Sequence, residues 1–409
     1  MCACTPGSLK LGDEPETGTG PETEGMSEGA SEPTTAGDET GAIEEPVPEG
    51  VLEWEQMLED FAGAAVAVGP DGTIVVLGQQ GYTKQGDGGT YESWWLGKFA
   101  ADGEVVWSHA TMNTGETTPI PLYLSVGGEG EIFVGVVGFG GGGDAVQMFA
   151  PDGELVWSTS VTAQIQTVQA TPEGGVIAGG VESLDGSSGV AWMISLDGAG
   201  DVRWKQTIDA LPMAYNQVRS IAIAGDDIVL AGSVGLGPSG LTEAWLRRSV
   251  RATGEELWDR TVAAEATDWA ENVGVTADGT ILVVYVVGGI RTVRAYTPAG
   301  EEQWSFVPGL ATGIEDMAVT ADGSFTLVDG LYLPPDDPDA CHGDFSPCPV
   351  RMQVERRWFD RTARWEVVNE ECSSAHKVAM APDDGVVVLA GCTPEFASKP
   401  VMGLLRYAP

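Results

Sequence analysis

The feature of this chain that most constrains its fold is a tryptophan that returns at near-regular spacing. The intervals between successive members are 53, 50, 47, 54, 46 and 61 residues. Six of the seven follow a glycine by four positions, and the exception has Arg361 in place of that glycine. A period in this range is typical of repeat architectures. The seven tryptophans are Trp54, Trp107, Trp157, Trp204, Trp258, Trp304 and Trp365.

Each repeat also contains a second turn upstream of its tryptophan. In VGVTADGTILVVY (273–285) and MAVTADGSFTLVDG (317–330), two short apolar strands flank an Asp-Gly pair, which favours a tight turn. The Gly-x-x-x-Trp stretch, as in AADGEVVWSHAT (100–111), joins a third strand to a fourth. Four antiparallel strands per repeat describe one blade of a propeller. The sequence therefore predicts an all-β protein, a seven-bladed β-propeller of four-stranded antiparallel blades.

The two ends of the repeat region complement each other. The last repeat begins near His376 and stops at LLRYAP (404–409), after its third strand. The segment Glu49 to Trp54 supplies a Gly turn and a fourth strand that has no first three strands before it. We expect this N-terminal strand to complete the last blade, because that pairing removes an exposed sheet edge. The predicted propeller domain is 48–409.

Three of the repeats, RATGEELW (251–258), YTPAGEEQW (296–304) and APDGELVW (150–157), resemble the tryptophan-docking, PQQ-like repeat of quinoprotein-like propellers. The resemblance covers roughly 48–409. It implies that the repeated tryptophans are structural and pack between neighbouring blades, with each indole N–H finding a partner. Enzymes, assembly factors and binding scaffolds share this repeat, so it implies a fold more strongly than a function.

The N-terminal segment 1–47 has a different composition from the repeats. The first fifty residues hold twelve acidic residues and one basic residue and few large apolar ones, which predicts a disordered acidic linker. Met1-Cys2-Ala3-Cys4 resembles the end of a bacterial lipoprotein signal, with Cys4 as the lipidated residue, although the apolar segment that normally precedes such a box is missing. The resemblance implies a protein of the bacterial cell envelope, anchored to the outer membrane by its lipid alone, or periplasmic or extracellular. We expect it to be a monomer.

The charge balance narrows the range of partners. The chain carries 61 acidic and 20 basic residues, for a formal net charge of -41. Nucleic acids and anionic lipid headgroups are bound by clusters of Lys and Arg, so this surface repels both. We expect no nucleic-acid partner.

Four cysteines lie in the last two repeats. In an exported β protein they are expected to form two disulfides, and three pairings are open. We favour Cys341–Cys348, inside an insertion at about 331–350, together with Cys372–Cys392. The alternative for the insertion is a zinc site built from Cys341, His342 and Cys348.

Three further segments are candidate sites. The acidic stretch PPDDPDACHGD (334–344) is a candidate calcium site, although its spacing is not that of an EF-hand and a solvated acidic loop is the alternative. FGGGGD (139–144) is interpreted as a loop, because a strand and not a helix is expected after it. Trp94-Trp95, with Tyr91, form either a binding surface or a buried cluster between blades. The calcium candidates are Asp336, Asp337, Asp339 and Asp344.

No residue pattern points to catalysis. The three histidines, His109, His342 and His376, lie outside the hydrolase and metalloprotease motifs. We therefore expect a non-enzymatic, lipid-anchored scaffold without a cofactor that binds a protein or a glycan. By resemblance, two alternatives are a PQQ-dependent dehydrogenase and an outer-membrane protein assembly factor. Both typically have eight blades, and the dehydrogenases commonly carry a vicinal disulfide that this chain lacks.

Overall fold

The computed structural model describes residues 49–85, 88–112, 120–138, 143–183, 189–208, 216–235, 241–262, 268–308, 313–332, 350–392 and 400–409. All of them belong to the second of the chain's two parts, Val47–Pro409. The predicted linker and Cys4 lie outside these ranges. None of the described residues lies in a helix with the length and apolarity that crossing a membrane requires.

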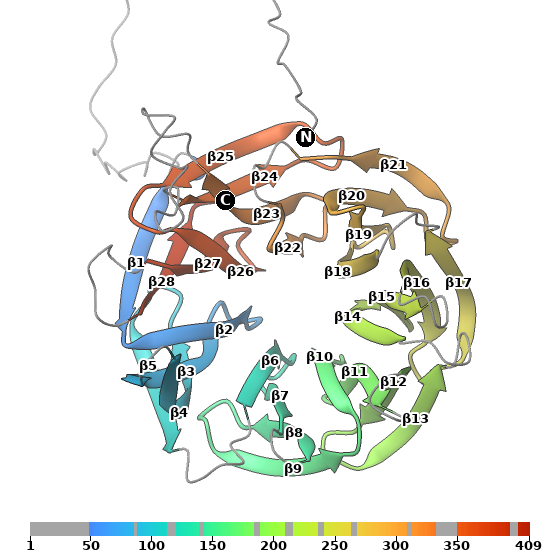
Figure 1. The fold of residues 1–409 in the computed structure, drawn as a ribbon, viewed down its shortest axis with the longest axis horizontal. Coiled ribbons are helices and arrows are strands. Elements are labelled where there is room, and N and C mark those ends of the chain that lie inside the picture. The colour runs from blue at the N-terminus through green and yellow to red at the C-terminus, as the bar shows by residue number, and fades with distance from the viewer. Residues whose placement is uncertain are drawn as a thin grey trace, which may run out of the picture. The chain divides into compact units, whose positions relative to one another are not determined.

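Seven four-stranded antiparallel sheets form a ring of blades (Figure 1). The first blade contains β2 (Phe61–Val68), β3 (Ile74–Gln85), β4 (Gly88–Phe99) and β5 (Val105–Met112). The second contains β6 (Ile120–Val126), β7 (Ile132–Val137), β8 (Asp144–Phe149) and β9 (Leu155–Val161). The third contains β10 (Gln164–Ala170), β11 (Val176–Ser183), β12 (Gly189–Leu196) and β13 (Val202–Ile208).

The remaining blades follow the same order. The fourth contains β14 (Gln217–Ala224), β15 (Asp227–Gly235), β16 (Thr242–Val250) and β17 (Glu256–Val262), and the fifth β18 (Trp269–Val275), β19 (Ile281–Val287), β20 (Ile290–Tyr296) and β21 (Glu302–Phe306). The sixth contains β22 (Asp316–Val319), β23 (Phe325–Tyr332), β24 (Val350–Arg357) and β25 (Ala363–Asn369). The seventh combines β26 (Ser374–Met380), β27 (Val386–Gly391) and β28 (Val401–Tyr407) with β1 (Leu52–Glu59).

The N-terminal strand closes the ring, as the sequence predicts. β1 pairs antiparallel with β28, from Leu52 opposite Tyr407 to Glu59 opposite Val401. The backbone of Ala408 extends this pairing, because its N–H donates to the carbonyl of Val51 at 2.8 Å. The last blade is therefore assembled from both ends of the propeller sequence.

The hydrophobic core is divided among the seven blade interfaces, with one apolar cluster at each. Trp94 and Trp95 belong to two of these clusters. Trp95 lies 5.1 Å from Phe61 at the interface with the seventh blade, and Trp94 lies 6.2 Å from Phe149 at the interface with the second. Both side chains are half-buried, and this packing favours their interpretation as a cluster between blades rather than as a binding surface.

The repeated glycine supports the tryptophan of the preceding blade. Trp54 Nε1 donates to the carbonyl of Ala101 at 2.9 Å, and a Cβ on Gly103 would lie 2.9 Å from the indole. Gly103 has a φ of +86°, which side chains rarely adopt, so only glycine meets both demands easily. The same contact joins Trp107 to Gly153, Trp157 to Gly200, Trp204 to Gly254, Trp258 to Gly300 and Trp365 to Gly50.

The contact around Trp304 differs from the other six. The turn facing it carries Arg361 at a φ of +75°, with its guanidinium 5.7 Å from the centre of the Trp304 ring. Five repeat indoles donate to a turn carbonyl of the next blade, whereas Trp304 Nε1 and Trp365 Nε1 have no hydrogen-bond partner among the described residues. The docking hydrogen bond is therefore missing both at Trp304, which faces Arg361, and at Trp365, which packs on Gly50.

Candidate functional site in the central channel

The inner strands of the seven blades surround a cavity of about 300 Å³ on the axis of the ring. The first strand of each blade lies nearest the axis (Figure 1), so each blade contributes side chains to this space. The lining strands are β2, β6, β10, β14, β18, β22 and β26. Because they are the innermost strands of paired sheets, their backbones are held in fixed positions.

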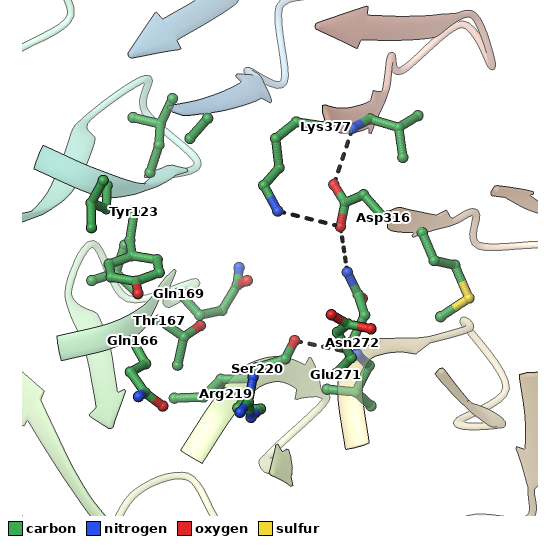
Figure 2. A pocket seen from close by; sticks show the side chains of 18 of the residues that line it. Tyr123, Gln166, Thr167, Gln169, Arg219, Ser220, Glu271, Asn272, Asp316 and Lys377 are labelled. Atoms are coloured by element: carbon green, nitrogen blue, oxygen red, sulfur yellow. Dashed lines mark hydrogen bonds and ion pairs between the residues drawn. The ribbon is translucent and has the colours of Figure 1, made fainter. Parts of the chain in front are cut away.

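Polar side chains divide the channel into two halves (Figure 2). One half holds uncharged hydrogen-bonding groups, and the other holds most of the charged groups. The uncharged half contains Tyr123, Gln166, Thr167 and Gln169, and the opposite half contains Glu271, Asn272, Asp316 and Lys377, with Arg219 and Ser220 between them.

Asp316 connects three blades in the charged half. Its carboxylate accepts hydrogen bonds from Asn272 Nδ2 at 2.5 Å and from the N–H of Val378 at 3.0 Å, while Lys377 Nζ lies 3.9 Å away. Burial raises the pKa of Asp316 above its usual value, although Lys377 and the backbone amide oppose that effect. The fifth, sixth and seventh blades are thus joined by one polar network at the channel wall.

The other charged groups in the channel are also held by neighbours. Glu271 forms an ion pair with Arg291 at 3.0 Å, and the Arg219 guanidinium lies 5.3 Å from the centre of the Trp269 ring. Burial raises the pKa of the Tyr123 phenol, so its hydroxyl stays protonated at neutral pH and remains able to donate. The channel offers donors and acceptors in a fixed arrangement, which suits recognition of a polar ligand.

Two of the three histidines, His109 and His376, lie among the described residues, on an outer and an inner strand. His109 is exposed on β5, 5.1 Å from the ring of Trp107. His376 is on β26, where Nε2 lies 3.2 Å from Ser374 Oγ. Within the described ranges, Ser374 is the side chain that shares a hydrogen bond with His376.

Only some of the predicted cysteine and metal-site residues lie in the part of the chain that the structure describes. Cys372 and Cys392 form a disulfide, the pairing favoured for them. Cys341, His342, Cys348 and the calcium candidates Asp336, Asp337, Asp339 and Asp344 lie outside the described residues. Within those residues, no group of three or more His, Cys, Asp or Glu could hold a metal ion. After the glycines of 139–144, β8 begins at Asp144, so a strand follows that loop as expected.

The channel residues were not among the sequence candidates. A signal for them exists in the inner strands, where polar residues interrupt otherwise apolar stretches, as in QIQTVQA (164–170) and WAENVGV (269–275). That alternation indicates a strand with one face away from the core. It does not show that the seven inner strands face one common axis.

The fold and its docked tryptophans define a PQQ-like-repeat β-propeller. Residues 95–313, more than half of the chain, match the PQQ_2 family model, described as "Outer membrane protein assembly factor BamB", and the chain belongs to this family. No curated protein matches it.

Solved propellers are similar in fold. The WD40 propeller domain of Doa1 is 9% identical, with a TM-score of 0.55 over 87% of this chain and 96% of that one. A catalytically inactive virginiamycin B lyase from Staphylococcus aureus, solved with quinupristin, is 10% identical, with a TM-score of 0.51 over 86% and 98%. At these identities the likeness concerns the fold alone.

Proposed function

We propose that this protein is a non-enzymatic scaffold of the bacterial cell envelope that holds a partner protein on a rigid ring and is tethered through lipid on Cys4. The observation that carries the proposal is the match of more than half of the chain to a family model named after an assembly factor. The docked tryptophans support the proposal, because they hold the ring rigid. A rigid surface loses little conformational entropy when a partner binds to it. The assembly-factor alternative agrees with the same match, although this ring has seven blades and not eight.

The experiment for the scaffold is affinity capture from cross-linked, detergent-solubilised envelopes of cells that express the full-length gene product. We expect one stoichiometric protein partner. Capture of no partner above a control propeller, such as the Doa1 domain, would rule the proposal out.

The anchor is tested separately. Wild type should fractionate with membranes and accumulate as a precursor under globomycin, whereas Cys4→Ser should be found in the soluble fraction. A wild-type protein that is soluble in both conditions removes the lipid from the proposal and leaves the scaffold untouched.

The channel favours a second candidate function, which is binding of a glycan. Its volume of about 300 Å³ suits one or two sugar units, and its amide, hydroxyl and carboxylate groups match sugar hydroxyls. Titration calorimetry with envelope oligosaccharides tests this, with Asn272→Ala and Gln169→Ala expected to weaken binding.

Reconstitution with pyrroloquinoline quinone and calcium, followed by dye reduction with alcohols and sugars, tests the dehydrogenase alternative. Turnover in that assay would displace the non-enzymatic proposal.

A further inference from the structure

Among the described residues, the fourth strand of each blade lies at the outer edge of its sheet and pairs with one neighbouring strand. These strands follow the outer rim of the ring (Figure 1). A free edge presents unpaired backbone N–H and C=O groups, and natural proteins protect such edges with charged side chains. The seven edge strands are β1, β5, β9, β13, β17, β21 and β25.

Two adjacent blades lack this protection. β5 and β9 contain no Asp, Glu, Lys or Arg, whereas the other five edge strands each contain at least one. The charged residues are Arg203 and Lys205 in β13, Glu256, Asp259 and Arg260 in β17, Glu302 in β21, Arg364 and Glu366 in β25, and Glu53, Glu55 and Glu59 in β1.

The same two strands expose consecutive aliphatic side chains. Val105 and Val106 in β5 are 59% and 56% exposed, and Leu155 and Val156 in β9 are 53% and 55% exposed. Each pair lies at a β-bulge, where the ladder with the neighbouring strand skips Val106 in β5 and Val156 in β9. The surface at the start of each edge is therefore apolar. The corresponding pair in every other edge strand contains at least one polar or charged residue.

We infer that the edges of β5 and β9 accept an extended segment of a partner protein as an added strand. The inference rests on the proposed scaffold function and names the form of its partner. Backbone hydrogen bonds from the free edge would hold the segment, and the exposed aliphatic pairs would contact its apolar side chains. The occupant is a β-prone segment without acidic residues, about as long as β9.

The negative charge beside both edges favours a strand from another protein over a strand from a second copy of this chain. Asp102 and Glu104 precede β5, and Asp152 and Glu154 precede β9, so each edge begins beside two carboxylates. A second copy would place these carboxylates near each other and bring together two chains of formal net charge -41. A partner segment flanked by Lys or Arg meets the same carboxylates favourably.

The test uses the full-length protein and a synthetic probe, a fluorescein-labelled peptide of alternating Thr and Val with Lys at both ends. Fluorescence anisotropy measures binding to wild type, to the double variant Val106→Lys/Val156→Lys, and to the control variant Leu257→Lys on β17. The control suits the comparison because the side chain of Leu257 is 50% exposed and charged neighbours already protect the edge of β17. Circular dichroism confirms that each variant is folded. We expect the double variant to raise the Kd about tenfold or more, because it places charges on both edges, and the control to change it by less than about twofold.

Two further measurements locate the contact. A peptide N-methylated at every Thr and Val, which lacks the backbone donors of both of its edges, should not bind, and amide hydrogen exchange should slow in β5 and β9 on addition of the unmodified peptide. Equal binding by wild type and double variant, binding of the N-methylated peptide, or protection confined to other strands overturns the inference. So does a wild-type dimer in sedimentation that the double variant abolishes, since the occupant would then be a second copy. An envelope partner captured equally by the double variant would leave the scaffold function standing and remove only the strand-docking site.

Discussion

The indole of Trp365 packs against the backbone of Gly50, although the two residues lie at opposite ends of the propeller sequence. A Cβ on Gly50 would lie 2.9 Å from Trp365 Cδ2. Two ion pairs support the same junction, Arg364 to Glu49 at 3.1 Å and Arg406 to Glu53 at 2.6 Å. The non-covalent closure of the ring therefore uses the docking contact that joins the other blades.

Substitution of Gly50 by alanine should weaken this closure. The variant places a side chain at a φ of +71°, which costs about 1–2 kcal/mol, and also overpacks Trp365, which costs about 1–3 kcal/mol more. The matched control is Gly225→Ala, where φ is +66° and no atom lies within 4 Å of the added Cβ. Urea unfolding should show a larger loss for Gly50→Ala than for Gly225→Ala, and equal losses would contradict the docking role of Gly50.

Substitution of the docking tryptophans by phenylalanine should separate packing from hydrogen bonding. Trp54→Phe removes the bond from Nε1 to the carbonyl of Ala101, at a cost of about 1 kcal/mol beyond the lost packing. Trp304→Phe removes an Nε1 group that has no partner among the described residues, so it should cost less. Thermal unfolding of both variants gives the comparison. A larger loss for Trp304→Phe would show that the hydrogen bond contributes little to docking.

Removal of the disulfide should destabilise the last blade. Cys372 and Cys392 are 20 residues apart in sequence, and a cross-link over a loop of this length contributes about 3 kcal/mol. The double variant Cys372→Ala/Cys392→Ala should lose about that free energy of unfolding in urea. Any sensitivity to reductant that remains in the double variant would come from the other four cysteines, and thiol labelling with mass spectrometry would show whether the predicted Cys341–Cys348 bond is present.

The contributions of Asp316 and Asp322 to the free energy of unfolding should change in opposite directions with pH. The pKa of Asp316 is raised above its ordinary 3.8 in the folded state by burial, so its contribution is fully present below that value and is lost as pH rises through the raised pKa. Hydrogen bonds from Thr320 and Ser324 lower the pKa of Asp322, so its contribution is present above 3.8 and is lost as pH falls.

Urea unfolding between about pH 3 and 7 measures both effects, with Asp316→Asn and Asp322→Asn compared with wild type at each pH. The stability of wild type relative to Asp316→Asn should fall as pH rises, and that relative to Asp322→Asn should rise. A pH-independent difference for Asp316→Asn would mean that the folded protein does not perturb this carboxyl.

The repeat spacing was enough to predict the class of fold, the number of blades and the closing strand. Each of these follows from local patterns, because the Asp-Gly turns and the Gly-x-x-x-Trp stretches set strand lengths and order within about fifty residues. The structure adds one contact that the pattern by itself does not state. The glycine and the tryptophan of one repeat do not contact each other. Gly103 packs against Trp54 of the preceding repeat, and Trp107 packs against Gly153 of the following one.

The candidate site was decided by tertiary structure alone. Asn272, Asp316 and Lys377 come from three blades, and nothing in their local sequence states that they meet. Their distances follow from how far each blade is rotated about the axis, and the raised pKa of Asp316 follows from burial by the residues around it. The sequence determined how six of the blades form, because each of them depends on contacts between neighbours in the chain, and the patterns at its two ends predicted how the seventh is completed. The channel and its electrostatics depend on all seven blades at once, so only the closed ring could define them.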